Sequence, residues 1–284
     1  MIDLHAATVL LQWATGGLFF TWVTTRHRIV SLGYGWLLRG TFAFIGACGV
    51  AAGIVGGPYW PREIFGIASI VAALVVLGVS IVRRQAGVSG QREIVERRSE
   101  RVAAMTGIDR EEQRFDKTQA EFDPRLDLIA PALGLVAIIG GAIHAGGPLW
   151  LGILRVLTGT ALMGALSDAM LLGHWYLTQP GLPRAPILEL VKWNLIVFPP
   201  AVIALLLPTG MISVLNGTID DGYEGFAGWF WVMSAVATGG LLVVTRLALK
   251  ERQYAAVMAA TGLLYLAILM GFVTDIVGRI LLDA

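Results

Sequence analysis

An aspartate stands inside a stretch of sequence that is otherwise apolar enough to cross a lipid bilayer. Asp168 lies within Leu149–Thr178, a run longer than the roughly 20 apolar residues that span the hydrocarbon core. An ionisable group at membrane depth is costly and marks a functional site or a buried pair. Lys192 and Asn194, on the next apolar run, fall at a similar depth by the helical rise, so they are its expected partners. Structural pairing and a role in proton or substrate passage are both open.

The four histidines of the chain suggest two levels at which a haem could be held. His5 and His144 fall near one end of their apolar runs, and His27 and His174 fall near the other end. Imidazoles that face each other across helices are the axial ligands of a b-type haem. The two levels lie about 30 Å apart by the helical rise, however, which is long for one electron-transfer step. Interfacial histidines hydrogen-bonded to water or lipid headgroups are the alternative.

A His-Trp-Tyr triplet, His174 to Tyr176, follows Asp168 on the same apolar run. Trp175 and Tyr176 are typical of the aromatic belt at a membrane interface. The triplet would also suit a flat amphipathic headgroup such as a quinone, because ligand pockets are mostly apolar with a few convergent polar groups. A histidine there could exchange protons near neutral pH. The candidate catalytic residues are therefore Asp168, Lys192 and His174. The candidate residues for binding quinone or haem b are His174, His144, His5, His27, Trp175, Tyr176 and Asn194, and no metal site is expected.

A second polar group lies toward the opposite side of the membrane. Arg155 and Asp275 both fall about 12 Å from the centre of their runs by the helical rise. Asp275 and Arg279 are also spaced i,i+4, so they can pair along one helix. We expect these residues to brace the helices, with Arg155 facing the run that holds Asp275.

The composition places the chain among membrane proteins. Its 284 residues are 56% apolar and 14% charged, against about 25% charged in soluble domains, and the mean hydropathy is +0.72. The net charge of +1 argues against a general polyanion-binding role. Basic patches interleaved with aromatic residues are absent, so no nucleic-acid partner is expected. The single cysteine, Cys48, excludes an intrachain disulfide.

Eight apolar runs predict an all-α polytopic helix bundle that forms one membrane domain over residues 1–284. Two of the predicted turns, Gly56–Trp60 and Gly146–Trp150, share the pattern Gly-Gly-Pro-x-Trp, which suits tight turns at a membrane interface. The predicted spans are Leu4–Thr24, Leu37–Gly57, Glu63–Val82, Leu126–Ala145, Leu149–Thr178, Ile187–Leu207, Phe226–Leu249 and Tyr254–Leu282.

The distribution of basic residues predicts the orientation. Most of the 21 Lys and Arg residues fall on one side of the predicted membrane, and the opposite loop, 209–225, has acidic residues but no basic one. Cytoplasmic loops carry the excess of positive charge, so both termini are expected outside. The expected location is the plasma (inner) membrane, with the lipid bilayer and other membrane subunits as partners.

A charged cytoplasmic loop, residues 83–125, joins the third and fourth predicted spans. Glu and Arg recur there at three- and four-residue spacings that favour a solvated helix. A thin apolar stripe on that helix suits a membrane surface or a partner helix. The stripe consists of Ile94, Val95, Val102 and Met105.

Three functions remain open at this stage. The first is an integral membrane subunit of respiratory or redox chemistry that binds a quinone or a b-type haem at the membrane interface. The second is a small proton-coupled transporter that uses Asp168 and Lys192. The third is a non-catalytic scaffold or assembly subunit whose polar residues serve helix packing. Motifs of zinc proteases and serine hydrolases are absent.

Overall fold

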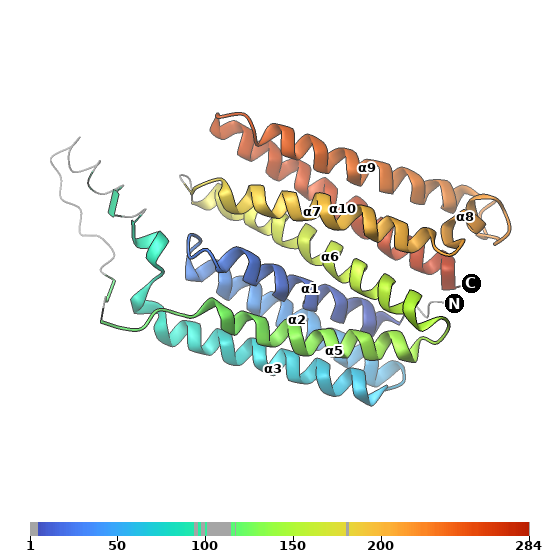
Figure 1. The fold of residues 1–284 in the computed structure, drawn as a ribbon, viewed down its shortest axis with the longest axis horizontal. Helices are drawn as coiled ribbons and strands as arrows, with labels where there is room; N and C mark the ends of the chain where they lie inside the picture. The colour runs from blue at the N-terminus through green and yellow to red at the C-terminus, as the bar shows by residue number, and fades with distance from the viewer. Residues whose placement is uncertain are drawn as a thin grey trace.

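The computed structural model of the chain is built from helices. It describes residues 5–93, 96–97, 100, 115–116, 118–179 and 182–283. Within those residues, eight helices are long and apolar enough to cross a membrane, as a multi-pass membrane bundle requires (Figure 1). They are α1 (Ala6–Thr25), α2 (Leu32–Gly56), α3 (Trp60–Val82), α5 (Ile129–His144), α6 (Leu149–Thr178), α7 (Ala185–Leu206), α9 (Phe226–Ala248) and α10 (Tyr254–Asp283).

Short helices fill parts of the connections. The 3₁₀ turn η1 (Arg83–Ala86) follows α3, and the 3₁₀ turn η2 (Pro124–Leu128) leads into α5. One short helix, α8 (Gly210–Leu215), lies between α7 and α9. The expected apolar stripe of the charged loop falls outside the described residues.

The turns follow from local chemistry. The α2–α3 turn contains Gly57 at φ +115°, and the α5–α6 turn contains Gly146 at φ +74° and Gly147 at φ +72°. Positive φ is open to glycine because it lacks a Cβ. At the start of α9, the Asp221 carboxylate accepts backbone N–H groups of Tyr223, Gly225 and Gly228. These bonds satisfy amides that a helix start leaves unpaired.

The bundle has two halves that meet at α1 and α6. Helices α1, α2, α3 and α5 form one half, and α6, α7, α9 and α10 form the other (Figure 1). A Cβ atom on Gly16 of α1 would lie 2.0 Å from the backbone oxygen of Thr160 on α6. Glycine therefore lets the two backbones touch, as small residues do in membrane helix packing.

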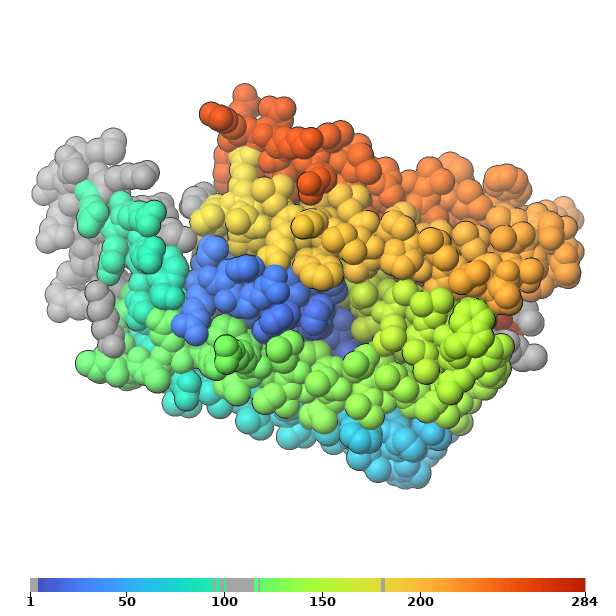
Figure 2. Space-filling view, viewed as in Figure 1, coloured from blue at the N-terminus to red at the C-terminus, as the bar shows by residue number. Residues whose placement is uncertain are grey.

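The two ends of the bundle differ. At one end, which we call the terminal end, α1 begins and α10 finishes; at the opposite end, the loop end, α3 finishes and η2 leads into α5 (Figure 1). In Figure 2 the residues that follow α3, in teal, project beyond α1 and α5 at the loop end. Which end faces the cytoplasm stays a prediction.

Candidate functional site

Among the described residues, Asp168 differs from three other buried acids of the bundle because it has no cation paired with it. Its residue is 0% exposed, and neither carboxyl oxygen has a hydrogen-bond partner among the described residues. Three other buried acids each have an arginine. These pairs are Glu63 with Arg62, Asp127 with Arg39, and Asp275 with Arg279. Buried charges are normally paired in this way, so the environment of Asp168 needs a separate explanation.

The polar groups around Asp168 come from three other helices. On α1, the Thr21 hydroxyl adjoins the carboxyl group but donates to the Gly17 carbonyl at 2.8 Å. On α2, the Tyr34 hydroxyl donates to the backbone oxygen of Asp168 at 3.3 Å. On α7, Asn194 meets the same turn of α6 by donating to the Ala165 carbonyl at 2.9 Å. The carboxyl group is therefore enclosed at a junction of four helices.

The expected pair of Asp168 and Lys192 does not form. Lys192 lies on an exposed face of α7, whereas Asp168 is fully buried. Asn194 is buried, but its amide donates to the carbonyls of Ala165 and Leu190 rather than to the carboxyl group. The predicted depth of the three residues carried no information on which way each side chain points.

Trp175 lies two helical turns beyond Asp168, toward the loop end. Seven residues at 1.5 Å each place it about 10 Å along the axis and on nearly the same face of α6. Tyr34 links the two levels, since its ring meets the Trp175 ring edge-on at 5.7 Å and its hydroxyl reaches the backbone of Asp168.

Trp175 also lines a cavity of about 440 Å³ at the loop end, which we call the loop-end pocket. Its walls come from the start of α2, the residues after α3 and the end of α6. Two further aromatic rings and several amide and hydroxyl groups complete the lining. The residues are Ser31, Leu32, Gly33, Trp36, Arg84, Gln85, Gly87, Gln91, Phe115, Trp175 and Gln179. A cavity of this size and mixed lining is typical of a small-molecule site.

Two buried polar groups of this pocket are left without a partner. The Ser31 hydroxyl and the Trp175 indole N–H have no hydrogen-bond partner among the described residues. The indole N–H of Trp36, by contrast, donates to the Ser80 hydroxyl at 3.0 Å. Buried donors are normally satisfied, so unpaired ones beside a cavity are suited to a ligand with acceptor oxygens.

Each of the four histidines contacts a different kind of group. His27 Nε2 lies 2.7 Å from Glu189 Oε2, and His174 Nδ1 lies 3.1 Å from the Tyr265 hydroxyl. His5 Nδ1 accepts the Ala7 amide at the start of α1. His144 stacks on the Tyr59 ring with centroids 4.6 Å apart.

The structure separates the members of the His-Trp-Tyr triplet. His174 is exposed toward α10, Trp175 lines the loop-end pocket, and the Tyr176 hydroxyl donates to the Pro183 carbonyl. Consecutive helical residues point about 100° apart, so three neighbours cannot share one pocket wall. Trp175 is therefore the one member of the triplet that lines the loop-end pocket.

The polar group at the terminal end braces helices. Arg155 does not face Asp275; it donates to the carbonyls of Ala204 at 2.9 Å and Leu207 at 2.6 Å, at the end of α7. The last carbonyls of a helix lack intrahelical partners and carry partial negative charge, which suits a guanidinium. Arg279 pairs with Asp275 and donates to the Arg155 backbone oxygen at 3.2 Å.

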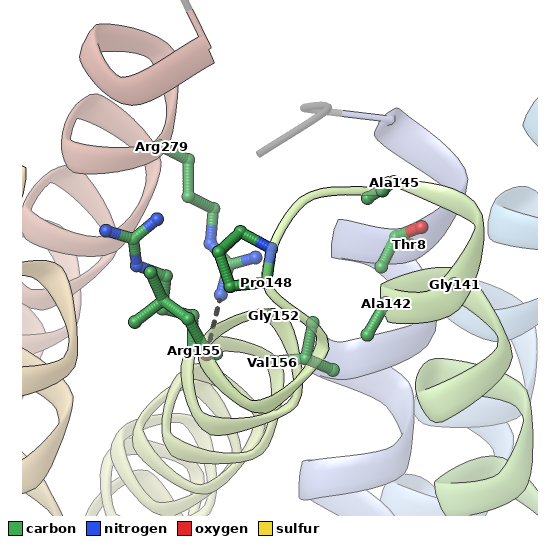
Figure 3. Close-up of a pocket in the computed structure, with 11 residues that line it drawn as sticks. Thr8, Gly141, Ala142, Ala145, Pro148, Gly152, Arg155, Val156 and Arg279 are labelled. Atoms are coloured by element: carbon green, nitrogen blue, oxygen red, sulfur yellow. Dashed lines mark hydrogen bonds between the residues drawn. The ribbon is translucent and has the colours of Figure 1, made fainter. Parts of the chain in front are cut away.

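A small cavity of about 40 Å³ adjoins these arginines, room for about one water molecule. Figure 3 shows Arg279 reaching from α10 to the backbone of Arg155, while the Arg155 side chain turns away from Thr8 and Ala142. The geometry is that of a structural brace.

Sequence reasoning missed Ser31, Tyr34 and Trp36 as site residues. Ser31 is the N-cap of α2, and Tyr34 and Trp36 belong to its first turns; the helix begins at Leu32 rather than at the expected Leu37. Nothing in their types or spacing marked them, because a Gly-Tyr-Gly-Trp stretch beside a charged segment is typical of an interface.

Comparisons with protein-family models, curated proteins and solved structures find no match to this chain. The described residues also contain no group of three or more His, Cys, Asp or Glu placed to hold a metal ion. Function must therefore be argued from the geometry of the two linked features, Asp168 and the loop-end pocket.

Proposed function

We propose that the protein is a membrane subunit of respiratory or redox chemistry that binds a quinone headgroup in the loop-end pocket. The observation that carries the proposal is the cavity lined by Trp36, Phe115 and Trp175, two of whose lining residues, Ser31 and Trp175, carry a buried donor with no partner among the described residues. A quinone ring offers two acceptor oxygens and flat faces that pack on aromatic side chains.

The location of the pocket agrees with an amphipathic ligand. Arg84, Gln85 and Gln91 give it a polar rim beyond the end of α3, while Trp175 belongs to a spanning helix. A ligand with a polar head and an apolar tail could therefore reach the pocket from the bilayer. The proposal places the loop end at the cytoplasmic face of the plasma membrane, because basic residues gather there.

The test uses variants that remove the donors without breaking a bond seen within the protein. Trp175→Phe keeps an aromatic ring but loses the N–H, and Ser31→Ala loses the hydroxyl. Each should lower the quinone content of purified protein several-fold, since one net hydrogen bond contributes about 0.5–1.5 kcal/mol. Mass spectrometry of extracted lipid measures the content, and Trp150→Phe, an exposed tryptophan in the α5–α6 turn region at the terminal end, is the matched control. Equal quinone content in all variants would remove the pocket from consideration.

The haem alternative has weaker geometric support. His27 and His174 contact Glu189 and Tyr265 rather than each other, and His5 and His144 contact the Ala7 amide and the Tyr59 ring. An absorption spectrum of the purified protein decides the matter. A Soret band that shifts on reduction would establish a bound haem and outweigh these histidine contacts as evidence.

A proton-coupled transporter is the second candidate, and the unpaired carboxyl of Asp168 favours it. Intramembrane acids mark the proton relays of pumps and transporters. Vesicles containing the protein would then take up substrate in response to a pH gradient. Asp168→Asn should abolish that uptake, whereas Asp275→Asn should reduce it only through lost stability.

A further inference from the structure

The hydrogen atoms around Asp168 can be accounted for one by one. The Thr21 hydroxyl gives its proton to the Gly17 carbonyl, and the Tyr34 hydroxyl gives its proton to the Asp168 backbone oxygen. The two amide hydrogens of Asn194 go to the carbonyls of Ala165 and Leu190, both at 2.9 Å. The donor hydrogens of these polar side chains are therefore already used in hydrogen bonds to backbone carbonyls.

What remains around the carboxyl group is acceptor capacity. The Thr21 oxygen beside the carboxyl group keeps a lone pair, and Asn194 Oδ1, whose amide meets the α6 turn that precedes Asp168, is buried without a partner among the described residues. An ionised carboxylate can only accept hydrogen bonds, whereas a protonated carboxylic acid can donate one. The surroundings therefore suit the protonated form, which can donate to an acceptor, better than the ionised form.

No free cation offsets a charge at this position among the described residues. On α2, Tyr34 is uncharged and Arg39 is bound to Asp127; on α7, Lys192 lies on an exposed face. The α1 neighbour Thr21 does not titrate, and the contacts of α10 with this part of α6 include Gly271 against Leu166 and Thr261 against Gly173, none of which is charged. On α6 itself, the Tyr176 hydroxyl is bound to the Pro183 carbonyl and His174 is exposed.

We propose that Asp168 is a proton-binding site, held as a neutral carboxylic acid, that exchanges its proton with the loop end of the bundle. Tyr34 marks the route, because it contacts Asp168 on one side and the Trp175 wall of the loop-end pocket on the other. Toward the terminal end, buried Leu162, Met163 and Leu166 and the Gly16 crossing close the path.

This inference goes beyond ligand binding in the loop-end pocket. It concerns the protein's own carboxyl group and holds whether the pocket takes a quinone or another molecule. A proton site beneath a ligand pocket would allow the occupancy of one to influence the other, as coupled sites do in general.

The direct test is the infrared spectrum of the full-length protein in lipid vesicles. At neutral pH the carbonyl-stretch band of a protonated carboxylic acid should be present, lost in Asp168→Asn and kept in Asp275→Asn, whose acid is bound to Arg279. Asp168→Glu should shift the band rather than remove it, which covers the case in which the asparagine variant does not fold. Absence of the band from the unmodified protein, or its persistence in Asp168→Asn, overturns the proposal.

The route is tested by transferring the same vesicles to D₂O and timing the isotope shift of the band. Tyr34→Phe should slow the exchange several-fold, because it removes the hydroxyl beside Asp168. The control is Tyr254→Phe, whose hydroxyl donates to the Tyr176 carbonyl at the loop end. Equal exchange rates in the two variants would refute the route through Tyr34. If the purified protein contains no quinone while the infrared band is unchanged, the proposed ligand is refuted and the proton site is kept.

Discussion

The buried pair of Arg39 and Asp127 gives the sharpest prediction for stability. Arg39 Nε lies 2.6 Å from Asp127 Oδ1, and Nη2 lies 2.7 Å from Oδ2, which is a bidentate pair. The two side chains are 2% and 3% exposed. The pair ties α2 to η2, and the Thr25 hydroxyl adds a bond from α1 to the same carboxylate at 3.0 Å. Three segments therefore depend on one acid.

Asp127→Asn keeps the shape of the side chain and removes its charge, which leaves the Arg39 guanidinium buried and uncompensated. Removing one partner of a buried pair costs about 3–5 kcal/mol. The unfolding equilibrium constant should therefore rise by between about a hundredfold and several thousandfold. Replacing both partners, as Arg39→Met with Asp127→Leu, should recover part of that loss because neither charge is then left alone.

Unfolding in mixed detergent micelles, followed by circular dichroism, measures these free energies. The matched control is Glu93→Gln, which breaks the exposed Arg97–Glu93 pair, whose side chains are 72% and 65% exposed. That change should cost no more than about 0.5 kcal/mol. A cost for Asp127→Asn as small as the control, or a double variant less stable than the single one, would refute the reasoning.

Two further predictions concern the helix crossing and the loop before α9. Gly16→Ala should destabilise the bundle by about 1–3 kcal/mol in the same assay, since its Cβ would meet the Thr160 oxygen, whereas Gly40→Ala, with open space around it, should be neutral or stabilising. Backbone N–H groups, led by that of Gly225, hold the pKa of Asp221 below its ordinary value. The stabilisation is therefore present above the unfolded-state pKa and is lost as the pH falls through the folded-state pKa. The protection of the amides at the start of α9, which is the slowing of their hydrogen exchange relative to the intrinsic rate at the same pH, should fall over that interval. In Asp221→Ala the protection should be low at every pH and independent of this titration; unchanged protection in the variant would contradict the role of the carboxylate.

The helices could be predicted from the sequence because length and apolarity determine them. Each predicted span coincides with an observed helix, and Leu149–Thr178 agrees at both ends. The largest difference is the start of α2, where Gly33 and Gly35 obscured a helix that begins at Leu32. The short helix α8, GMISVL, is apolar but has only six residues, too few for a predicted span.

The site was harder to predict because hydropathy gives height in the membrane but not the direction of a side chain. Asp168 was identified as unusual, yet its expected partner Lys192 points away from it. The seven-residue spacing of Asp168 and Trp175 was present in the sequence, and it placed both on one face of the helix. Tyr34 reaches that face, and Ser31 comes to share a pocket with Trp175, only through the tertiary packing of the bundle, which no local pattern encodes.

The measurement that tests the central claim most directly is photoaffinity labelling of the protein in vesicles with an azido-substituted quinone. Mass spectrometry of the digested protein locates the crosslink. We predict crosslinks in the segments that line the loop-end pocket, around Ser31, Gln85 and Trp175, and their suppression by excess unlabelled quinone. Crosslinks confined to the terminal end, or crosslinks at the pocket that excess quinone does not suppress, would contradict the account.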